Sequence, residues 1–215
     1  MRNLSYVLLM LLWGSNTFAQ EVSIPEKTIK VSLVNASGEN GISNERALEL
    51  FTNVKQLYSE DLALTLKLVK YRKRRNPYKQ TLETSNRLRV LRGWEGYFKR
   101  RRDTNKAVLH LVIMNPIKDQ GHYWLAGYAN GTCMYKRLTP VAVSNAEEYN
   151  SVGVPRFAHS TYALAHEAGH LLGAPHDDSL PATVMHSACM AYVDAQGGEL
   201  HFSQSSFSKI RKCVR

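Results

Sequence analysis

The sequence lacks an apolar run long enough to cross a membrane. The first apolar run, Tyr6–Trp13, has eight residues, whereas a spanning helix needs about twenty. Arg2 precedes this run, and Thr17–Ala19 resembles a site at which a signal peptidase cuts. We therefore predict that residues 1–19 are a secretory signal that is removed, and that the mature protein is secreted and extracellular, with no membrane span.

The sequence also lacks internal repeats, low-complexity tracts and linkers. The remaining residues, 20–215, are therefore predicted to form one domain with a substantial core. Alternating or continuous apolar residues predict strands at 27–34, 62–71, 107–114, 122–129 and 139–144, and helical spacing predicts helices at 43–59, 81–100, 157–173 and 203–214. This order predicts an α/β (α+β) fold, in which helices are packed on a mixed sheet.

Acidic residues are scarce beside basic ones: 18 Asp and Glu against 28 Lys and Arg give a net charge of +10. Much of the excess lies in two clusters, "KYRKRR" at 70–75 and "KRRR" at 99–102. They could bind heparan sulfate or another anionic surface, or form a solvated basic face. Cleavage by a proprotein convertase at 72–75 is disfavoured, because it would remove the first strand and helix. The predicted signal excludes nuclear targeting, so no nucleic-acid partner is expected.

Three histidines and a glutamate fall within one short stretch, "HEAGHLLGAPHDD". His166 and His170 are four residues apart, so on a helix their rings point to the same side. Gly173 is placed to end that helix in a left-handed conformation, so that the chain can bring His176 back to the same point. Three neutral imidazoles with one open coordination position are the ligand set of a catalytic zinc ion.

Glu167 lies beside the point on which the histidine rings converge, because it follows His166 by about 100° around the helix. Zinc lowers the pKa of a bound water, and a nearby carboxylate can take its proton. Glu167 is therefore the candidate catalytic residue. A lone histidine is more often structural, but five positions agree here with the pattern HExxHxxGxxH: His166, Glu167, His170, Gly173 and His176.

The stretch resembles the zinc signature of the metzincin metalloproteases, and Asp177 after the third histidine resembles their reprolysin (adamalysin, ADAM-type) branch. The resemblance implies a metzincin catalytic domain over residues 20–215, with a mixed five-stranded sheet, packed helices and a zinc cleft between a large upper and a small lower part. It also implies a methionine turn beneath the metal, for which Met185 is the candidate. Gly173 and Asp177 would then support the ligand loop.

The spacing around the methionine leaves the branch open. Met185 lies nine residues beyond His176, and this short link is more similar to that of the matrix metalloproteases. An astacin-type enzyme would have a tyrosine where this sequence has Ser187. Compact reprolysin-like enzymes without a visible propeptide resemble those secreted in arthropod saliva or venom, which suggests extracellular matrix or clotting proteins as substrates.

The resemblance also assigns residues to substrate binding. In this family an extended peptide pairs with the edge strand upstream of the zinc helix. The corresponding residues of this sequence are Leu125, Ala126 and Gly127. A hydrophobic wall below the zinc would come from His186, Ser187 and Ala188.

The chain contains only three cysteines, Cys133, Cys189 and Cys213. In a secreted chain these should be partly disulfide-bonded, and the sequence alone allows any of three single bridges. The resemblance favours Cys133–Cys213, because reprolysins join a cysteine before the zinc motif to one at the end of the domain. Cys189 would then be left over, whether buried, reduced or bonded to another chain.

Two stretches fit the pattern for N-glycosylation, Asn35-Ala36-Ser37 and Asn130-Gly131-Thr132. We therefore predict that Asn35 and Asn130 carry glycans. The second position lies near the predicted substrate edge, so a glycan at Asn130 could restrict access to it.

Together these features predict a monomeric, secreted zinc endopeptidase that hydrolyses peptide bonds in extracellular proteins by a zinc-bound water, with Glu167 as general base. Its cofactor would be a single Zn²⁺ held by His166, His170 and His176. The alternative is a catalytically weak, cationic secreted protein that keeps the fold and binds a glycosaminoglycan or an acidic protein. The basic clusters and the lack of a visible propeptide favour this alternative, whereas the intact Glu167 argues against it. A purely structural zinc site would be expected to have a fourth protein ligand.

Overall fold

The computed structural model of the chain describes residues 27–38, 41–75, 86–105, 107–114, 127–131, 133–146 and 158–215. The predicted signal at 1–19 lies outside these residues, as do Leu125 and Ala126. In the described part of the chain, no helix combines the length and the hydropathy that a membrane span requires.

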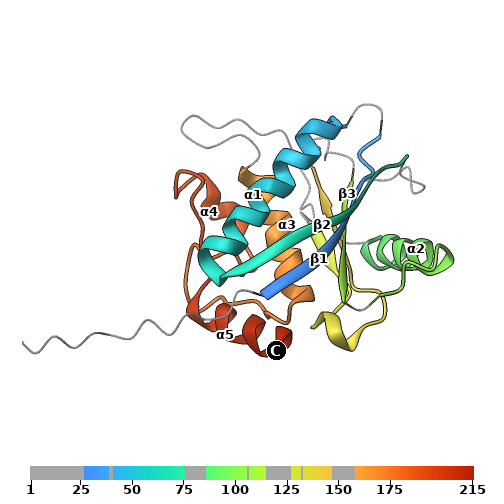
Figure 1. Cartoon of the computed structure of the whole chain (residues 1–215). Helices are drawn as coiled ribbons and strands as arrows, with labels where there is room; N and C mark the ends of the chain where they lie inside the picture. The colour runs from blue at the N-terminus through green and yellow to red at the C-terminus, as the bar shows by residue number, and fades with distance from the viewer. Residues whose placement is uncertain are drawn as a thin grey trace, which may run out of the picture.

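The strands of the described residues form one mixed sheet (Figure 1). It has five strands, in the order β2-β1-β3-β5-β4. The four that run parallel are β1 (Lys27–Asn35), β2 (Leu64–Lys73), β3 (Val108–Met114) and β5 (Val141–Asn145). β4 (Gly127–Ala129) pairs antiparallel with β5 and forms one edge, while β2 forms the other. β3 and β5 are buried almost throughout, as expected for strands that are covered on both faces.

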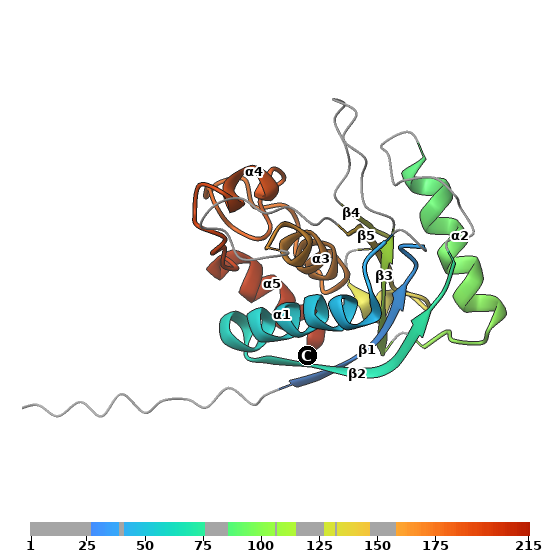
Figure 2. The ribbon, with the colours of Figure 1, turned by 90° about the horizontal axis from the view of Figure 1, so that it is seen from above.

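Helices cover both faces of this sheet (Figure 2). α1 (Asn44–Leu62) and α3 (Ala158–Leu171) pack on one face, and α2 (Arg87–Arg100) packs on the other. The chain then adds α4 (Cys189–Val193) and α5 (Gln204–Val214) on the side of α1 and α3. The larger core lies between α1, α3 and the sheet, and a smaller core lies beneath α2.

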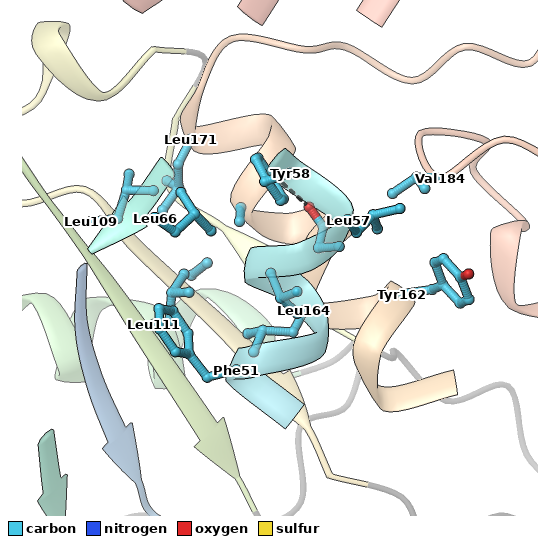
Figure 3. Packing of buried hydrophobic residues seen from close by; sticks show 14 of the residues in the cluster. Phe51, Leu57, Tyr58, Leu66, Leu109, Leu111, Tyr162, Leu164, Leu171 and Val184 are labelled. Atoms are coloured by element: carbon cyan, nitrogen blue, oxygen red, sulfur yellow. Dashed lines mark hydrogen bonds between the residues drawn. The ribbon is translucent and has the colours of Figure 1, made fainter. Parts of the chain in front are cut away.

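The larger core fixes α3, the helix that carries the first two histidines (Figure 3). Leu164 of α3 is fully buried among aliphatic side chains, and each such side chain stabilises the fold by about 1.5–3 kcal/mol. The hydroxyl of Tyr58 on α1 donates a 2.8 Å hydrogen bond to the Ala165 carbonyl. The Tyr58 ring also packs edge-to-face on Phe202, with 5.1 Å between centroids. Core packing and the hydrogen bond from Tyr58 therefore fix α3 directly before His166, the first histidine of the motif.

Each predicted strand and helix has a counterpart in the described residues, with shifts at the ends. α1 continues to Leu62, so β2 begins at Leu64 rather than at 62. The helix stops at Ala63, which adopts a left-handed conformation with φ of 47°. Sequence periodicity does not predict α4 or the 3-10 turn Met134–Lys136, because an element of five or three residues is too short to show an apolar repeat.

Cys133 and Cys213 form a disulfide, which confirms the predicted pairing. The bond links the start of the 3-10 turn to the last turn of α5, across a sequence separation of 80 residues. Closing a loop of that length restricts the unfolded chain and stabilises the fold by about 4.5 kcal/mol in the chain-entropy model. Cys189 is buried and lies outside this bond.

The prediction of a glycan at Asn35 is wrong for the folded protein. Asn35 is only 2 % exposed, and its amide nitrogen donates to the carbonyls of Ile42 (3.1 Å) and Ser43 (3.3 Å). A glycan would replace one of the two hydrogens on that nitrogen, so it would break at least one of these bonds and displace the side chains around the buried amide. The amide nitrogen of Asn130 also donates twice, to the Thr139 carbonyl at 2.9 Å and to the Glu95 carboxylate, so a glycan there stays a prediction that requires one of these bonds to open.

His110 on β3 gives the stability of the protein a predictable pH dependence. Its ring is buried and stacks on Phe98 of α2 with 4.1 Å between centroids. Burial lowers the pKa of His110 from 6.5 to about 4, in the presence of three nearby charged groups: Asp103, Arg72 and Lys70. Below pH 6.5 the unfolded chain therefore binds a proton that the folded chain does not, so the free energy of unfolding falls as the pH drops towards 4.

Urea unfolding at pH 7 and pH 5 measures this effect. Between these two values we expect the wild-type protein to lose about 2 kcal/mol more of its free energy of unfolding than the variant His110→Leu loses. The same loss in both proteins would show that His110 is not the group responsible.

Candidate metal centre

Three histidines from α3 and the loop after it converge on one point. His166 and His170 lie one turn apart on α3, with 4.7 Å between ring centroids. Gly173 follows the helix with φ of 94°, a conformation that favours glycine. This turn brings the ring of His176 to within 5.1 Å of His166 and 4.8 Å of His170, measured between centroids. One nitrogen can be chosen from each ring so that all three lie within 4.8 Å of one another.

Backbone carbonyls orient two of these rings. Nδ1 of His166 lies 2.7 Å from the Val184 carbonyl, and Nδ1 of His170 lies 2.8 Å from the Ala174 carbonyl. Because a carbonyl can only accept, Nδ1 carries the proton in each ring and Nε2 remains available to a metal. Burial, with the neighbouring imidazoles, lowers the pKa of His166 to about 3, and burial also lowers the pKa of His170. Both rings are therefore neutral at pH 7, as metal ligands must be.

The donor set fits zinc. Nε2 of His170 and Nε2 of His176 are 3.2 Å apart, and two nitrogens bound to one tetrahedral zinc would be separated by about 3.3 Å. Three imidazoles leave a fourth coordination position open, which is typical of catalytic rather than structural zinc. In the part of the chain that the structure describes, no other group of three potential ligands is close enough to hold a metal ion.

Glu167 lies next to the first ligand and is buried, with 7 % of its surface exposed. Burial raises the pKa of Glu167 to about 8, and a zinc ion held by the neighbouring histidines would lower this pKa and favour the ionised carboxylate that a general base requires. Its side chain faces β4: a Cβ atom on Gly127 would stand 2.4 Å from Cγ and 2.9 Å from Oε1 of Glu167. The side chain of Glu167 therefore occupies space that any residue other than glycine at position 127 would fill. Glu167 lies next to both the first ligand and the predicted substrate strand.

Met185 lies beneath the ligand helix and is fully buried. A Cβ atom on Gly169 would stand 2.5 Å from its sulfur, so Met185 packs directly against the backbone of α3 between the two helical ligands. Glycine inside a helix costs about 1 kcal/mol relative to alanine, and this contact explains its presence. The preceding residue, Val184, supplies the carbonyl that orients His166.

Asp177 ties the loop of the third ligand to the segments that follow it. Its backbone N–H donates to the Met185 carbonyl at 2.9 Å. Its carboxylate accepts hydrogen bonds from the hydroxyls of Ser179 (2.6 Å) and Ser203, and these bonds hold the pKa of Asp177 below its usual value. Because Ser203 is the N-cap of α5, one residue connects the ligand loop, the methionine turn and the C-terminal helix.

His186, Ser187 and Ala188 follow the methionine turn towards the surface. The N–H of Ser187 donates to Asp178 at 2.7 Å, and the N–H of Ala188 donates to His186 Nδ1 at 3.0 Å. His186 is half-buried and packs edge-to-face on Tyr192, whereas Ser187 and Ala188 are exposed. A role for these three residues in substrate binding stays a prediction.

Most of the groups that position the ligands cannot be identified from the sequence. The carbonyls of Ala174 and Val184 have no sequence signal, because every residue carries the same group. Gly127 is remote from Glu167 in the chain, so their contact depends on the tertiary fold. A signal exists only for Gly169, because a glycine inside a helical pattern often marks a close packing contact.

A sheet of this topology, with three imidazoles converging above a buried methionine, defines a class of protein: the metzincin-like zinc metalloproteases. The chain matches a reprolysin model, described as Metallo-peptidase family M12, over residues 30–208. It belongs to this family of metallopeptidases.

A solved structure of a metalloproteinase supports the fold. The crystal structure of metalloproteinase-II from Bacteroides fragilis is similar with a TM-score of 0.57 and 18% sequence identity, covering 88% of this chain and 54% of that one. At this identity the likeness shows the fold alone, and the chain spans about half the length of that protein. The structure of a chaperone-substrate complex is less similar, with a TM-score of 0.46 and 18% identity over 74% of this chain and 30% of that one. No curated protein matches the chain at a significant level.

Proposed function

We propose that this protein is a secreted zinc endopeptidase of the reprolysin branch, which hydrolyses peptide bonds in extracellular proteins. The observation that carries the proposal is the convergence of His166, His170 and His176, with the buried Glu167 beside them. Membership of the metallopeptidase family supports the chemistry. The signal-like start of the sequence supports secretion, and Asp177 after the third ligand supports the branch.

The residues of the site have distinct roles in this proposal. Zinc, when bound to the three histidines, supplies Lewis-acid chemistry at the carbonyl to be cleaved. Glu167 accepts a proton from the attacking water and passes it to the leaving amine. An extended substrate pairs with the edge strand β4 through backbone hydrogen bonds, which brings it next to Glu167. Asp177 and Met185 hold the ligand loop and the helix in position.

Removal and return of the metal tests this proposal. Protein expressed from the full chain in a secreting cell should be recovered from the medium and should cut an unfolded protein such as casein. A chelator should lower the rate at least about 100-fold, and one equivalent of zinc should restore it. If the protein holds one zinc by elemental analysis but cuts nothing, the peptidase proposal is wrong and the fold serves binding instead.

A further inference from the structure

We infer that α2 and the end of β2 form a docking surface for a linear sulfated polysaccharide, on the face of the sheet opposite to the ligand helix. This α2 surface consists of cations from two distant parts of the sequence: Lys70, Arg72 and Arg74 on and after β2, and Arg89, Arg92 and 99–102 on and after α2. It lies outside the metal centre, and it is a partner site rather than a part of the catalytic machinery.

A β-bulge in β2 directs three of the five cations at 70–75 towards α2. β2 pairs with β1 in parallel, and the register shifts by one residue at Val69. Side chains alternate along a strand, so the extra residue exchanges the two faces. Before the bulge, Leu64 and Leu66 face the core beneath α1. After it, the even-numbered residues Lys70, Arg72 and Arg74 face α2 instead, whereas Lys73 interacts with Glu45 on α1.

Contacts with the end of α2 show that the two basic clusters meet. Lys70 and Arg72 form ion pairs with Asp103, just beyond the helix, at 2.9 and 2.7 Å. The third cation, Arg74, lies over the ring of Tyr97 at 4.4 Å from its centroid. Arg101 lies over the same ring at 5.1 Å. Lys70, Arg72 and Arg74 therefore share one surface with the basic end of α2 in the folded protein.

Little negative charge balances this surface. Among the described residues, Asp103 is the one carboxylate that forms ion pairs with these cations. The carboxylate on α2 itself, Glu95, is hydrogen-bonded to Asn130 on the side of β4. The four basic residues at 99–102 are all exposed. The surface therefore retains a strong positive potential that attracts an anionic partner.

The cations extend along α2 as a stripe. Arg89 and Arg92 are exposed, as are Lys99 and Arg100 two turns further on, and this spacing places them on one side of the helix. The opposite side, which includes the fully buried Trp94, packs against the sheet. From Arg89 to Arg100 the helix rises about 17 Å, so the stripe can contact several charged groups of an extended chain.

A narrow stripe rich in arginine fits a sulfated polysaccharide better than a membrane. Guanidinium groups bind oxyanions such as sulfate through pairs of parallel hydrogen bonds. A helix that lies on a membrane inserts an apolar face, whereas the apolar face of α2 is buried in the core. A polysaccharide partner also requires an extracellular protein, so this part of the inference rests on the secretion proposed above.

The α2 surface is joined to the substrate edge without covering the metal centre. Arg87 at the start of α2 lies 5.1 Å from the centroid of the Tyr128 ring on β4. α3, with its two histidines, lies on the other face of the sheet (Figure 2). A polysaccharide bound along α2 would therefore retain the protein at a matrix and leave the metal centre accessible to a protein substrate.

The test compares two variants that remove the same charge from different surfaces. The first, on α2, is Arg92→Gln/Lys99→Gln/Arg100→Gln, and the control, on α1 and α5, is Lys55→Gln/Lys209→Gln/Lys212→Gln. All six positions are exposed, and glutamine maintains helix propensity. We expect the α2 variant to bind heparin at least about tenfold more weakly at about 0.15 M salt, and the control to change by less than about twofold. Heparin from which the sulfates are removed should bind wild type at least about tenfold more weakly than heparin does.

Three results would overturn the inference. An equal loss of affinity in both variants would show that net charge alone matters, and equal binding of sulfated and desulfated heparin would exclude recognition of sulfate. Binding to phosphatidylserine vesicles as tight as binding to heparin would assign a membrane surface instead. Cleavage of a peptide, measured in parallel, reports on folding and on the metal centre, so a failure of the proposed peptidase function would be seen separately.

Discussion

Glu167→Gln is expected to lower kcat/KM for a protein substrate by about 10³-fold or more, because it removes the group that accepts the proton in the proposed mechanism. Glutamine has nearly the shape of glutamate, so the packing of the side chain against Gly127 should persist. Two other nearby carboxylates are already engaged: Asp177 binds two serine hydroxyls, and Asp178 accepts the N–H of Ser187. Neither is placed to replace Glu167. Initial rates on an unfolded protein, with zinc content measured by elemental analysis, check this prediction.

A matched control is Glu199→Gln, which makes the same chemical change at an exposed position. Its rate should stay within about twofold of wild type, since surface changes away from the site have small effects. A rate above about one-tenth of wild type in the Glu167 variant, at full zinc content, would mean that another group is the base.

The metal centre could be predicted from sequence because its chemistry is local. His166, Glu167 and His170 share one helix, and Gly173 and His176 follow within six residues of His170. Their geometry then depends on the pitch of a helix and on one left-handed residue, both of which short-range rules describe. The strands could be predicted from sequence for a similar reason, because a buried strand has a continuous or alternating apolar pattern within a few residues.

What could not be predicted depends on contacts between distant parts of the chain. The sequence pattern at Asn35 fits a glycan, but only the fold shows that its amide is buried and holds the start of α1. The two basic clusters look unrelated in the sequence, and a single extra residue at Val69 brings them together. Gly127 was assigned to substrate binding by resemblance, but only the fold shows that a Cβ at this position would meet the side chain of Glu167.

Gly127→Ala is the second change with a large expected effect, a loss of about 10²- to 10³-fold in kcat/KM. The new Cβ would stand 2.4 Å from Glu167 Cγ, so the carboxylate must move, and a displacement of about 1 Å in a catalytic group can cost about 10²-fold in rate. Zinc content should not change, because the atoms that the new Cβ would meet belong to Glu167 and not to a ligand. The matched control is Gly96→Ala on α2, where the new atom would meet only the flexible end of Arg100 at 3.3 Å.

Combining the two changes separates two explanations for the importance of Gly127. If this glycine matters because it gives Glu167 its position, then Gly127→Ala should have little further effect in a protein that already carries Glu167→Gln, since both changes act through one group. If it matters because substrate binds along β4, the losses should multiply and KM should rise in both backgrounds. Gly127 could therefore act by positioning the proposed base or by binding substrate. The rates of wild type, the two single variants and the double variant distinguish these two roles.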